Sequence, residues 1–391
     1  METKSEYGLS GGWSGRGSLQ SLVKELERQK NSRIDFVADT RSLKLDATGP
    51  GQILLVPASS IAREWLPGDG VPVKVQALEQ MGQKSTPGVP VKFIKEMAQV
   101  RPGRLADLMN GLHEDEPSRR LVRMLDGQVR AFLSDRYRVL DNFDIAFAAM
   151  DAVRKSKGEI IEASLSDTHM RIKFTSREIW DVINVTRQGN SRSWYSGGLG
   201  SQAHLSRVAA KTGGDLPGGP GTVHPLVTIT NSETGHGGYN VRIGLLQAIC
   251  FNLATVENVV SRVHLGDRLE VGIFSEETVA QDSKAIFMKA RDAVKAAFQP
   301  DSFRRMVDLA RAAQEREVKA PQSAVANIAK ANHLSDEAKE SILSYFVKDY
   351  DMTNFGLAQA IARFAQDEAD GDKASAIEDV AGAVMASATA Y

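Results

Sequence analysis

Residues 119–142 read RRLVRMLDGQVRAFLSDRYRVLDN, and this stretch decides the fold predicted for the chain around it. Asp126-Gly127 lies between two runs in which apolar residues alternate with polar ones. Asp-Gly in this setting is typical of a two-residue type I′ turn, because both central positions need a positive φ. The sequence therefore predicts a β-hairpin in which Arg123 faces Arg130.

The predicted register gives the hairpin one apolar side and one side rich in arginine. The apolar side holds Val122, Met124, Val129, Ala131 and Leu133. The other side holds Arg119, Leu121, Arg123, Arg130, Phe132, Ser134, Arg136 and Arg138. Guanidinium groups on one face repel one another, and phosphates supply a counter-charge with bidentate geometry. We therefore expect the five arginines of this face to bind phosphates and Phe132 to stack on a base.

A second explanation fits the same residues. The chain's own carboxylates, such as Glu162 or the EDE segment at 114–116, would neutralise the arginines, and Phe132 would be a core residue. The two explanations place the same face either against a nucleic acid or inside the protein, and the sequence leaves both open.

A helix and a second hairpin are expected to follow. Asn142 would cap a helix that runs to Lys155, and residues 160–176 (IIEASLSDTHMRIKFTS) alternate like a second hairpin. The order hairpin, helix, hairpin predicts an α+β fold in which two antiparallel ribbons share one sheet and the helix covers its apolar side. Arg171 and Lys173, on the polar face of the second hairpin, would then extend the basic surface.

The rest of the chain divides into regions of different composition. Residues 1–17 are polar and predict a flexible N-terminus, and residues 18–275 would form the α+β core domain. Residues 276–391 show helical periodicity and predict a C-terminal helical domain. Its last part, residues 351–391, carries seven acidic side chains against two basic ones, so we expect an acidic tail able to compete with DNA for a basic groove.

One long segment of the core domain has a composition of its own. Residues 187–222 are rich in Gly and Ser, which predicts a mobile basic loop. Its cations and aromatic rings are further expected contacts for a nucleic acid. They are Arg187, Arg192, Trp194 and Tyr195.

Composition limits the kinds of partner. The chain has 391 residues and a net charge of −1, so affinity for an anionic partner must come from local clusters of cations. The single cysteine, Cys250, excludes internal disulfides and suits a reducing cytoplasm. No apolar run approaches the length of about 18 residues that a transmembrane helix needs. We therefore expect a cytoplasmic protein without a membrane partner.

The motifs of common enzyme classes do not occur in the sequence. There is no GxxxxGK[ST] loop, no CxxC pair and no closely spaced pair of histidines, so neither a cofactor nor a metal is expected. The weak candidates for acid–base or metal-assisted catalysis are Asp135, Glu233, His236 and His264. A simple turn, in which Asn and Ser bond the local backbone, would explain the TNSETGHGG segment equally well.

Five segments of the chain carry a resemblance to a known family: VRAFLSDRYRVLDN (129–142), TNSETG (230–235), AICFN (248–252), RVHLG (262–266) and TNFGLAQAIARFAQ (353–366). Together they resemble the phage/plasmid-like protein family. The resemblance extends from about Asp35 to Gln366, with SDRYR at 134–138 as its most specific part. It implies a mobile element of bacteria, and hence the cytoplasm of a bacterial host.

The arrangement of elements also looks like the core of the single-strand annealing proteins of the RecT and Erf type. That likeness implies rings or filaments that lay single strands along a basic groove. It rests on architecture, which does not fix function.

The leading hypothesis is a protein that binds single-stranded DNA and anneals strands without ATP in phage or plasmid recombination. Its expected partners are single-stranded DNA, with RNA as an alternative, further copies of the chain and a host single-strand-binding protein. One competing hypothesis is a mobile-element enzyme that processes nucleic acid or phosphate through Asp135, Glu233 and His236. The other is a structural or partner-binding protein without nucleic-acid contact.

Overall fold

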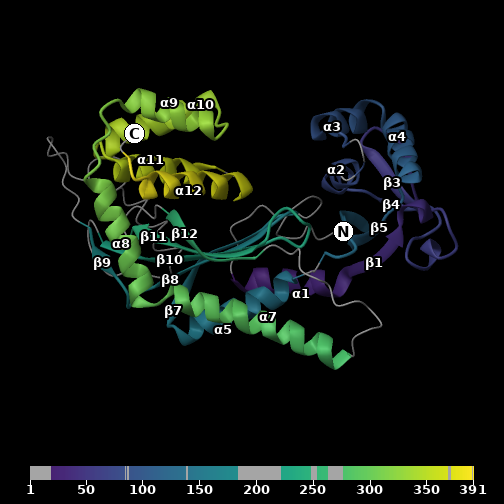
Figure 1. Cartoon of the computed structure of the whole chain (residues 1–391), viewed down its shortest axis with the longest axis horizontal. Helices are drawn as coiled ribbons and strands as arrows, with labels where there is room; N and C mark the ends of the chain where they lie inside the picture. Colours follow the sequence, from purple (N-terminus) through teal and green to yellow (C-terminus); the bar gives the residue numbers. More distant parts are fainter. Residues whose placement is uncertain are drawn as a thin grey trace, which may run out of the picture.

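The computed structural model describes residues 19–83, 85, 88–137, 140–183, 222–247, 253–262, 276–368, 371–389 and 391. The elements are α1 (Leu19–Ser32), β1 (Arg33–Asp39), η1 (Thr40–Ser42), β2 (Leu43–Gly49), β3 (Gln52–Pro57), η2 (Ala62–Glu64), β4 (Val71–Pro72), α2 (Val75–Gln83), α3 (Val91–Val100), α4 (Pro102–Asp115), β5 (Arg119–Leu125), β6 (Gln128–Ser134), α5 (Asn142–Lys155), β7 (Gly158–Leu165), β8 (Met170–Ser176), β9 (Asp181–Val182), β10 (Thr222–Asn231), β11 (Tyr239–Gln247), β12 (Leu253–Arg262), α7 (Glu276–Ala297), α8 (Pro300–Gln314), α9 (Pro321–Ala331), α10 (Asp336–Asp349), α11 (Asn354–Asp367) and α12 (Gly371–Ala386). They form an N-terminal unit and a larger unit around a long sheet, which Figure 1 shows side by side.

The N-terminal unit contains two small antiparallel sheets, with strand orders β1-β5-β6 and β2-β3-β4. Helices α2, α3 and α4 lie beside these sheets (Figure 1). Apolar side chains of the strands and helices meet in one buried core. Among its members are Ile53, Leu55, Met81, Ile94, Leu105 and Met109. The unit therefore has a core of its own.

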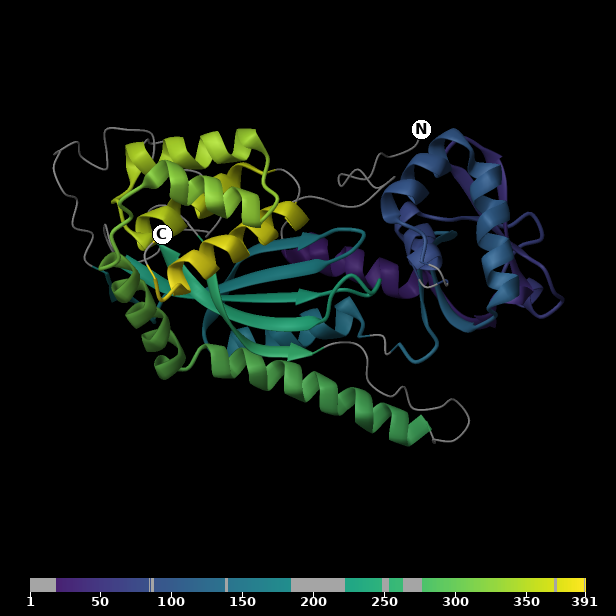
Figure 2. The ribbon, with the colours of Figure 1, turned by 45° about the horizontal axis from the view of Figure 1, so that its top comes forward.

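The larger unit is built on a sheet with the strand order β12-β11-β10-β8-β7, and β9 pairs with β10. Helices α1, α5 and α7 run along one side of this sheet, whereas α11 and α12 lie on the other (Figure 2). Alternation along the strands gives the sheet an apolar face and a polar face, because successive side chains point to opposite sides. The apolar face includes Ile172 and Phe174 of β8, and it packs into the main core.

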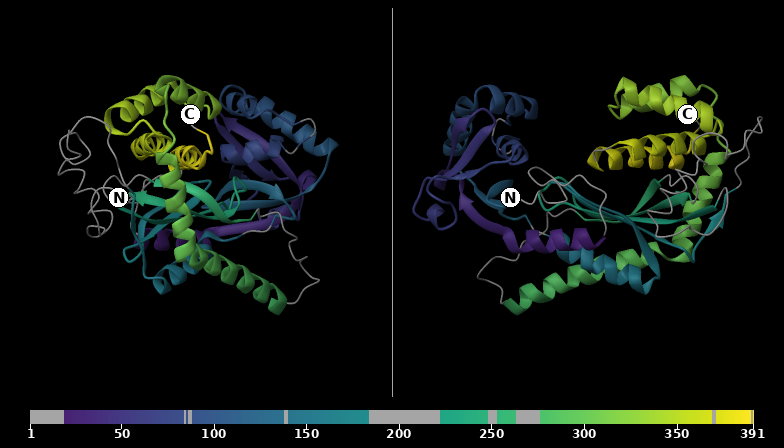
Figure 3. Two further views of the ribbon diagram at one scale, coloured as in Figure 1. Left: turned by 60° about the vertical axis from the view of Figure 1, so that its left-hand side comes forward. Right: turned by 180° about the vertical axis from the view of Figure 1, so that it is seen from behind.

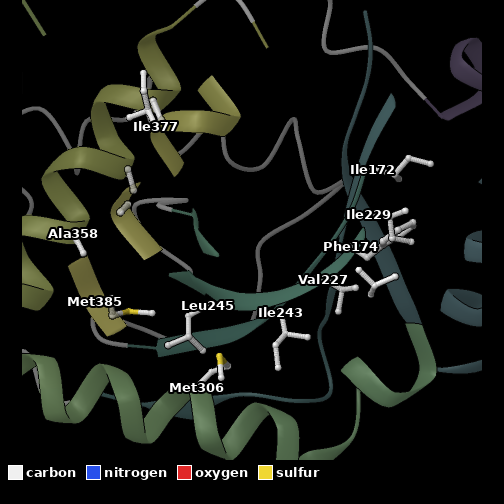
Figure 4. Close-up of a cluster of buried hydrophobic side chains, with 14 of the residues drawn as sticks. Ile172, Phe174, Val227, Ile229, Ile243, Leu245, Met306, Ala358, Ile377 and Met385 are labelled. Atoms are coloured by element: carbon white, nitrogen blue, oxygen red, sulfur yellow. The ribbon is translucent and has the colours of Figure 1, made fainter. Parts of the chain in front are cut away.

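The C-terminal helices share that core with the sheet. Figure 4 shows Met306 of α8 next to Ile243 and Leu245 of β11, and buried residues of α11 and α12 complete the cluster. Figure 3 shows α9 to α12 stacked above one end of the sheet, while the N-terminal unit lies at its other end. The domain boundaries expected from the sequence stay a prediction. None of the described helices has both the length and the apolar character needed to cross a membrane.

The α+β class is confirmed: antiparallel sheets are combined with a bundle of C-terminal helices. The expectation that the two hairpins share one sheet is wrong, because they belong to different sheets. The free edge of β5 pairs with β1, and the free edge of β8 pairs with β10. Both edges are thus occupied by strands distant in the sequence, and α5 packs against the sheet of the second hairpin.

The turn of the first hairpin forms as expected, with φ of 53° at Asp126 and 72° at Gly127. The register holds for the pairs next to the turn, Leu125 with Gln128 and Met124 with Val129. It then shifts by one residue, so that Arg123 pairs with Ala131 and not with Arg130. A β-bulge of this kind inserts one extra residue into a strand and inverts the alternation beyond it.

Candidate functional site

Both faces of the β5–β6 hairpin are buried. One face joins the core under the helices of the N-terminal unit, and its members are Val122, Met124, Val129 and Phe132. The other face forms a small cluster of Leu121, Ala131, Leu133 and Tyr137. Phe132 is 2% exposed, and its ring stacks on that of His113 with centroids 5.7 Å apart. The prediction that Phe132 offers an open surface for a base is therefore wrong, because the bulge turns it into the core.

Arg123 lies fully buried between the two units of the molecule. Its guanidinium donates to both carboxylate oxygens of Asp35, at 2.9 and 3.0 Å, and to the backbone carbonyl of Glu233 at 2.7 Å. Asp35 comes from β1, which pairs with β5 in register, whereas Glu233 comes from the turn between β10 and β11. Arg123 is thus saturated by the chain itself.

Glu233 brings a second arginine into the same place. Its carboxylate accepts hydrogen bonds from Arg130 and from the backbone N–H of Asn142, the latter at 2.6 Å. Burial alone would raise the pKa of this carboxyl, but Arg130 and Arg123 outweigh burial and hold the pKa below its usual value. The prediction of an open phosphate-binding face is therefore wrong at Arg123 and Arg130.

The cluster contains equal numbers of positive and negative groups. Arg33 pairs with Asp141, and Asp141 also lies 3.9 Å from Arg123. The six charged side chains are Arg33, Asp35, Arg123, Arg130, Asp141 and Glu233. Burial and the nearby Glu233 raise the pKa of Asp141, and the charges of Arg33 and Arg123 only partly offset this rise. The positive and negative charges of the cluster balance, so it has no excess charge for a ligand. We therefore interpret it as a contact that connects the two units and not as a binding surface.

The other arginines expected at this hairpin are placed differently. Arg119 and Arg136 are exposed, at the start of β5 and just beyond the end of β6. They lie apart from the buried cluster and do not complete an arginine face. Six further candidates lie outside the described residues: Arg138, Arg187, Arg192, Trp194, Tyr195 and His264.

A second group of cations occupies the polar face of the large sheet. Arg171 and Lys173 of β8 were expected there, and Arg242 of β11 joins them through the strand register. Lys173 pairs with Thr228 of β10, which in turn pairs with Arg242, so these three side chains form a row across three strands. Arg242 was not among the expected cations, although the alternation in YNVRIGLL places it opposite the apolar side chains of its strand.

Helix α12 covers these cations with carboxylates. Arg171 is paired with Asp372, Arg242 with Asp379, and the ammonium of Lys173 lies 2.7 Å from Glu378. Lys173 and Glu378 are buried, at 3% and 2% exposure, and Arg171 at 8%. The expectation that Arg171 and Lys173 form an open surface is therefore wrong in this structure. The residues that close it come from the acidic tail that the sequence set apart.

The carboxylate of Asp372 lies in a nest of donors at the β7–β8 turn. Ser166 Oγ is 3.1 and 3.2 Å from its two oxygens, Thr168 donates to it, and His169 Nδ1 lies 3.5 Å away. Burial favours the neutral acid, but hydrogen bonds from His169 and Thr168 and the charge of Arg171 hold the pKa of Asp372 far below its usual range. This turn is built to hold an anion.

The catalytic candidates are not brought together. Glu233 is committed to Arg130 and Asn142, and among the described residues no hydrogen bond joins it to Asp135 or His236. His236 is exposed, and its Nδ1 interacts with the hydroxyl of Thr234 at 3.0 Å. The described part of the chain contains no group of three or more His, Cys, Asp or Glu side chains with the geometry of a metal site.

Comparison of the chain with models of protein families, with curated proteins and with solved structures gave no match. The resemblance to phage/plasmid-like proteins and the architectural likeness to annealing proteins therefore stay predictions. What the chain does has to be argued from its own geometry. Its cations on the polar face of the large sheet, and the donors of the β7–β8 turn that face Asp372, are bound by α12 and not by the N-terminal unit.

Proposed function

We propose that the polar face of the large sheet binds single-stranded DNA, and that the chain uses this face to anneal complementary strands without ATP. The observation that carries the proposal is the match of Arg171, Lys173 and Arg242 with three carboxylates of one helix. These acids of one helix occupy the cations in the same way as the phosphates of a nucleic-acid strand would.

The character of this face supports the proposal. The opposite face of the same strands is apolar and packs well, with Ile172, Phe174 and Val227 fully buried. Burying ion pairs adds little net stability compared with apolar packing of similar volume. A sheet face that only packed against a helix would contribute more stability with apolar residues. The cations Arg171, Lys173 and Arg242 on this face therefore favour a second, anionic ligand.

Two buried donors on this face also support a replaceable occupant. Arg171 Nε and Thr228 Oγ1 have no hydrogen-bond partner within the described structure. A buried donor without a partner is destabilising by about 1–3 kcal/mol. Phosphate oxygens offer several acceptors at flexible angles and would satisfy both groups, which the carboxylates of α12 do not.

Binding requires that α12 leaves the face, and the energy involved can be estimated. The helix buries Ile377, Val384 and Met385, and exposing each costs about 1.5–3 kcal/mol. A hydrogen bond to a charged group contributes about 1.5–3 kcal/mol. The three apolar residues together account for about 4.5–9 kcal/mol. Each phosphate would replace a carboxylate that Arg171, Lys173 or Arg242 already binds, so most of this loss has to be offset by further copies of the chain that cover the exposed apolar residues. DNA as opposed to RNA, an oligomeric ring or filament, and a host single-strand-binding partner belong to this proposal as expectations.

The proposal is tested by removing the competing carboxylates. The α12 variant combines Asp372→Asn, Glu378→Gln and Asp379→Asn, and binding of a labelled oligo-dT is followed by fluorescence anisotropy. The matched control removes three exposed carboxylates from α10: Asp336→Asn, Glu337→Gln and Glu340→Gln. The α12 variant is expected to bind at least about tenfold more tightly than the wild type and the control, which corresponds to about one charge-assisted contact.

Salt dependence and annealing complete the test. For phosphate contacts at Arg171, Lys173 and Arg242 the logarithm of the affinity should fall with the logarithm of salt concentration with a slope of about −2. The α12 variant should also speed annealing of complementary oligonucleotides in the absence of ATP and magnesium. Equal binding by the α12 variant and the α10 control would overturn the proposal and favour a structural or partner-binding protein.

A further inference from the structure

The β7–β8 turn brings four different donors to one point. Ser166 and Thr168 contribute hydroxyls, His169 an imidazole and Arg171 a guanidinium, and all four face the carboxylate of Asp372. The hydroxyl of Thr168 also contacts His169 Nδ1 at 3.0 Å, and Ser166 Oγ accepts from the backbone N–H of His169 at 3.0 Å. The donors are therefore held in place by one another as well as by Asp372.

The other carboxylate of this turn does not belong to this group. Asp167 is in the same turn, but its side chain pairs with Lys74 of the N-terminal unit at 2.6 Å. Without Asp372 the turn would present a guanidinium, two hydroxyls and an imidazole with no carboxylate among them. Hydroxyls combined with an arginine suit a tetrahedral phosphate, whose several oxygens accept from all of them at once.

We infer that residues 166–171 form a phosphate-binding site, and that Asp372 occupies it as an internal substitute for a phosphodiester of single-stranded nucleic acid. The inference rests on the proposed function and deepens it, because it names where one backbone phosphate is fixed. Asp372 is tethered next to the site, so it competes at a high effective concentration and keeps the site filled in the absence of a ligand.

The first test uses inorganic phosphate, the smallest ligand of the site. Asp372→Asn removes the competing charge and keeps the size of the side chain. Binding is followed by the NMR signals of the His169 imidazole during a titration, with circular dichroism as the check of folding. The wild type should show no saturable shift over the titration. The variant should saturate in the same range, which requires an affinity for phosphate at least about tenfold above that of the wild type.

Two control variants separate the site from general charge effects. Asp379→Asn removes a carboxylate from the same helix, but one that pairs with Arg242 away from the turn. Asp336→Asn makes the same charge change on α10. Neither should create a saturable site for inorganic phosphate. Adding Thr168→Val to Asp372→Asn removes one donor without a change of charge, and it should lower the phosphate affinity again by about fivefold.

A second arm uses oligo-dT and distinguishes the sources of the phosphate. Asp372→Asn should bind the oligonucleotide more tightly than it binds inorganic phosphate, because the chain of phosphates also reaches Lys173 and Arg242. Saturable binding of inorganic phosphate without any gain for oligo-dT would make this a site for a free phosphate compound, and the proposed function would fail alone. Tighter binding of oligo-dT by both Asp372→Asn and Asp379→Asn, without saturable binding of inorganic phosphate by Asp372→Asn, would overturn the inference and leave the proposed function standing.

Discussion

Replacing Glu233 by Gln tests the view that the buried charges join the two units. The carboxylate accepts from Arg130 and from the N–H of Asn142, and it lies 4.0 Å from Arg123 Nη1. Gln keeps the size and an acceptor oxygen but removes the charge, so the three guanidiniums of the cluster, two of them buried, would face two carboxylates. Breaking a buried pair in this way costs about 3–5 kcal/mol, because one charge is left uncompensated.

The measurement is urea unfolding followed by far-UV circular dichroism, with the free energy extrapolated to water. Glu178→Gln is the matched control, because it makes the same Glu-to-Gln change in an exposed ion pair. Glu178 lies 3.0 Å from the ammonium of Lys157. An exposed pair contributes at most about 1 kcal/mol, so this variant should unfold close to the wild type. If Glu233→Gln loses no more stability than Glu178→Gln, the charges do not hold the units together and the reasoning is refuted.

Three further predictions concern stability and its dependence on pH. Phe132→Ala should lower the free energy of unfolding by about 3–5 kcal/mol, whereas Phe147→Ala, at a side chain 44% exposed, should change it far less; equal effects in urea unfolding would contradict the burial of Phe132. Gly235→Ala should lower the free energy of unfolding by about 1–3 kcal/mol, because Gly235 has a φ of +77° and a Cβ there would come within 2.6 Å of a leucine of β6. Gly103 has open space around it, so Gly103→Ala should stay within about 1 kcal/mol of the wild type in the same assay. The carboxyl of Asp372 has a lowered pKa when folded, so its contribution is fully present above the unfolded value of about 3.8 and is lost progressively as the pH falls from there towards the folded pKa. The difference in unfolding free energy between the wild type and Asp372→Asn should therefore begin to shrink below about pH 3.8, and a constant difference down to pH 2 would contradict the assignment.

The parts of the fold that could be predicted are those set by local pattern. The Asp126-Gly127 turn requires positive φ at two positions, and the structure has it there. The alternation in the second hairpin also holds, since Ile172 and Phe174 are buried on the apolar face. These features depend on neighbours in sequence, which is the information that a single sequence contains.

The parts that were wrong depend on contacts between distant segments. A bulge next to Arg130 reversed the side on which Phe132 lies, and no pattern in residues 119–138 marks a bulge. Arg123 is matched by Asp35 and Glu233, which are 88 and 110 residues away in the chain. The sequence raised neutralisation by the chain's own acids as an alternative, but it could not say which acids lie close enough.

Helix α5 shows the same limit on a smaller scale. The side chains Phe143, Phe147, Met150 and Val153 predict one apolar side by their spacing. Val153 is buried as expected, whereas Phe147 is exposed, and the rest of the buried face is a stripe rich in alanine. Small residues let this helix approach the sheet and α7 closely, and that closeness is decided by the partner and not by the helix's own pattern.

The place of Glu233 also has a consequence for the order in which a ribosome delivers the chain. Arg130 leaves the ribosome 103 residues before the carboxylate that neutralises it. At a synthesis rate of about 5–20 residues per second, the N-terminal unit would remain for roughly 5–20 seconds without the carboxylate that neutralises Arg130. During synthesis this unit should therefore stay incomplete, and open to chaperones, until the β10–β11 turn emerges and closes it.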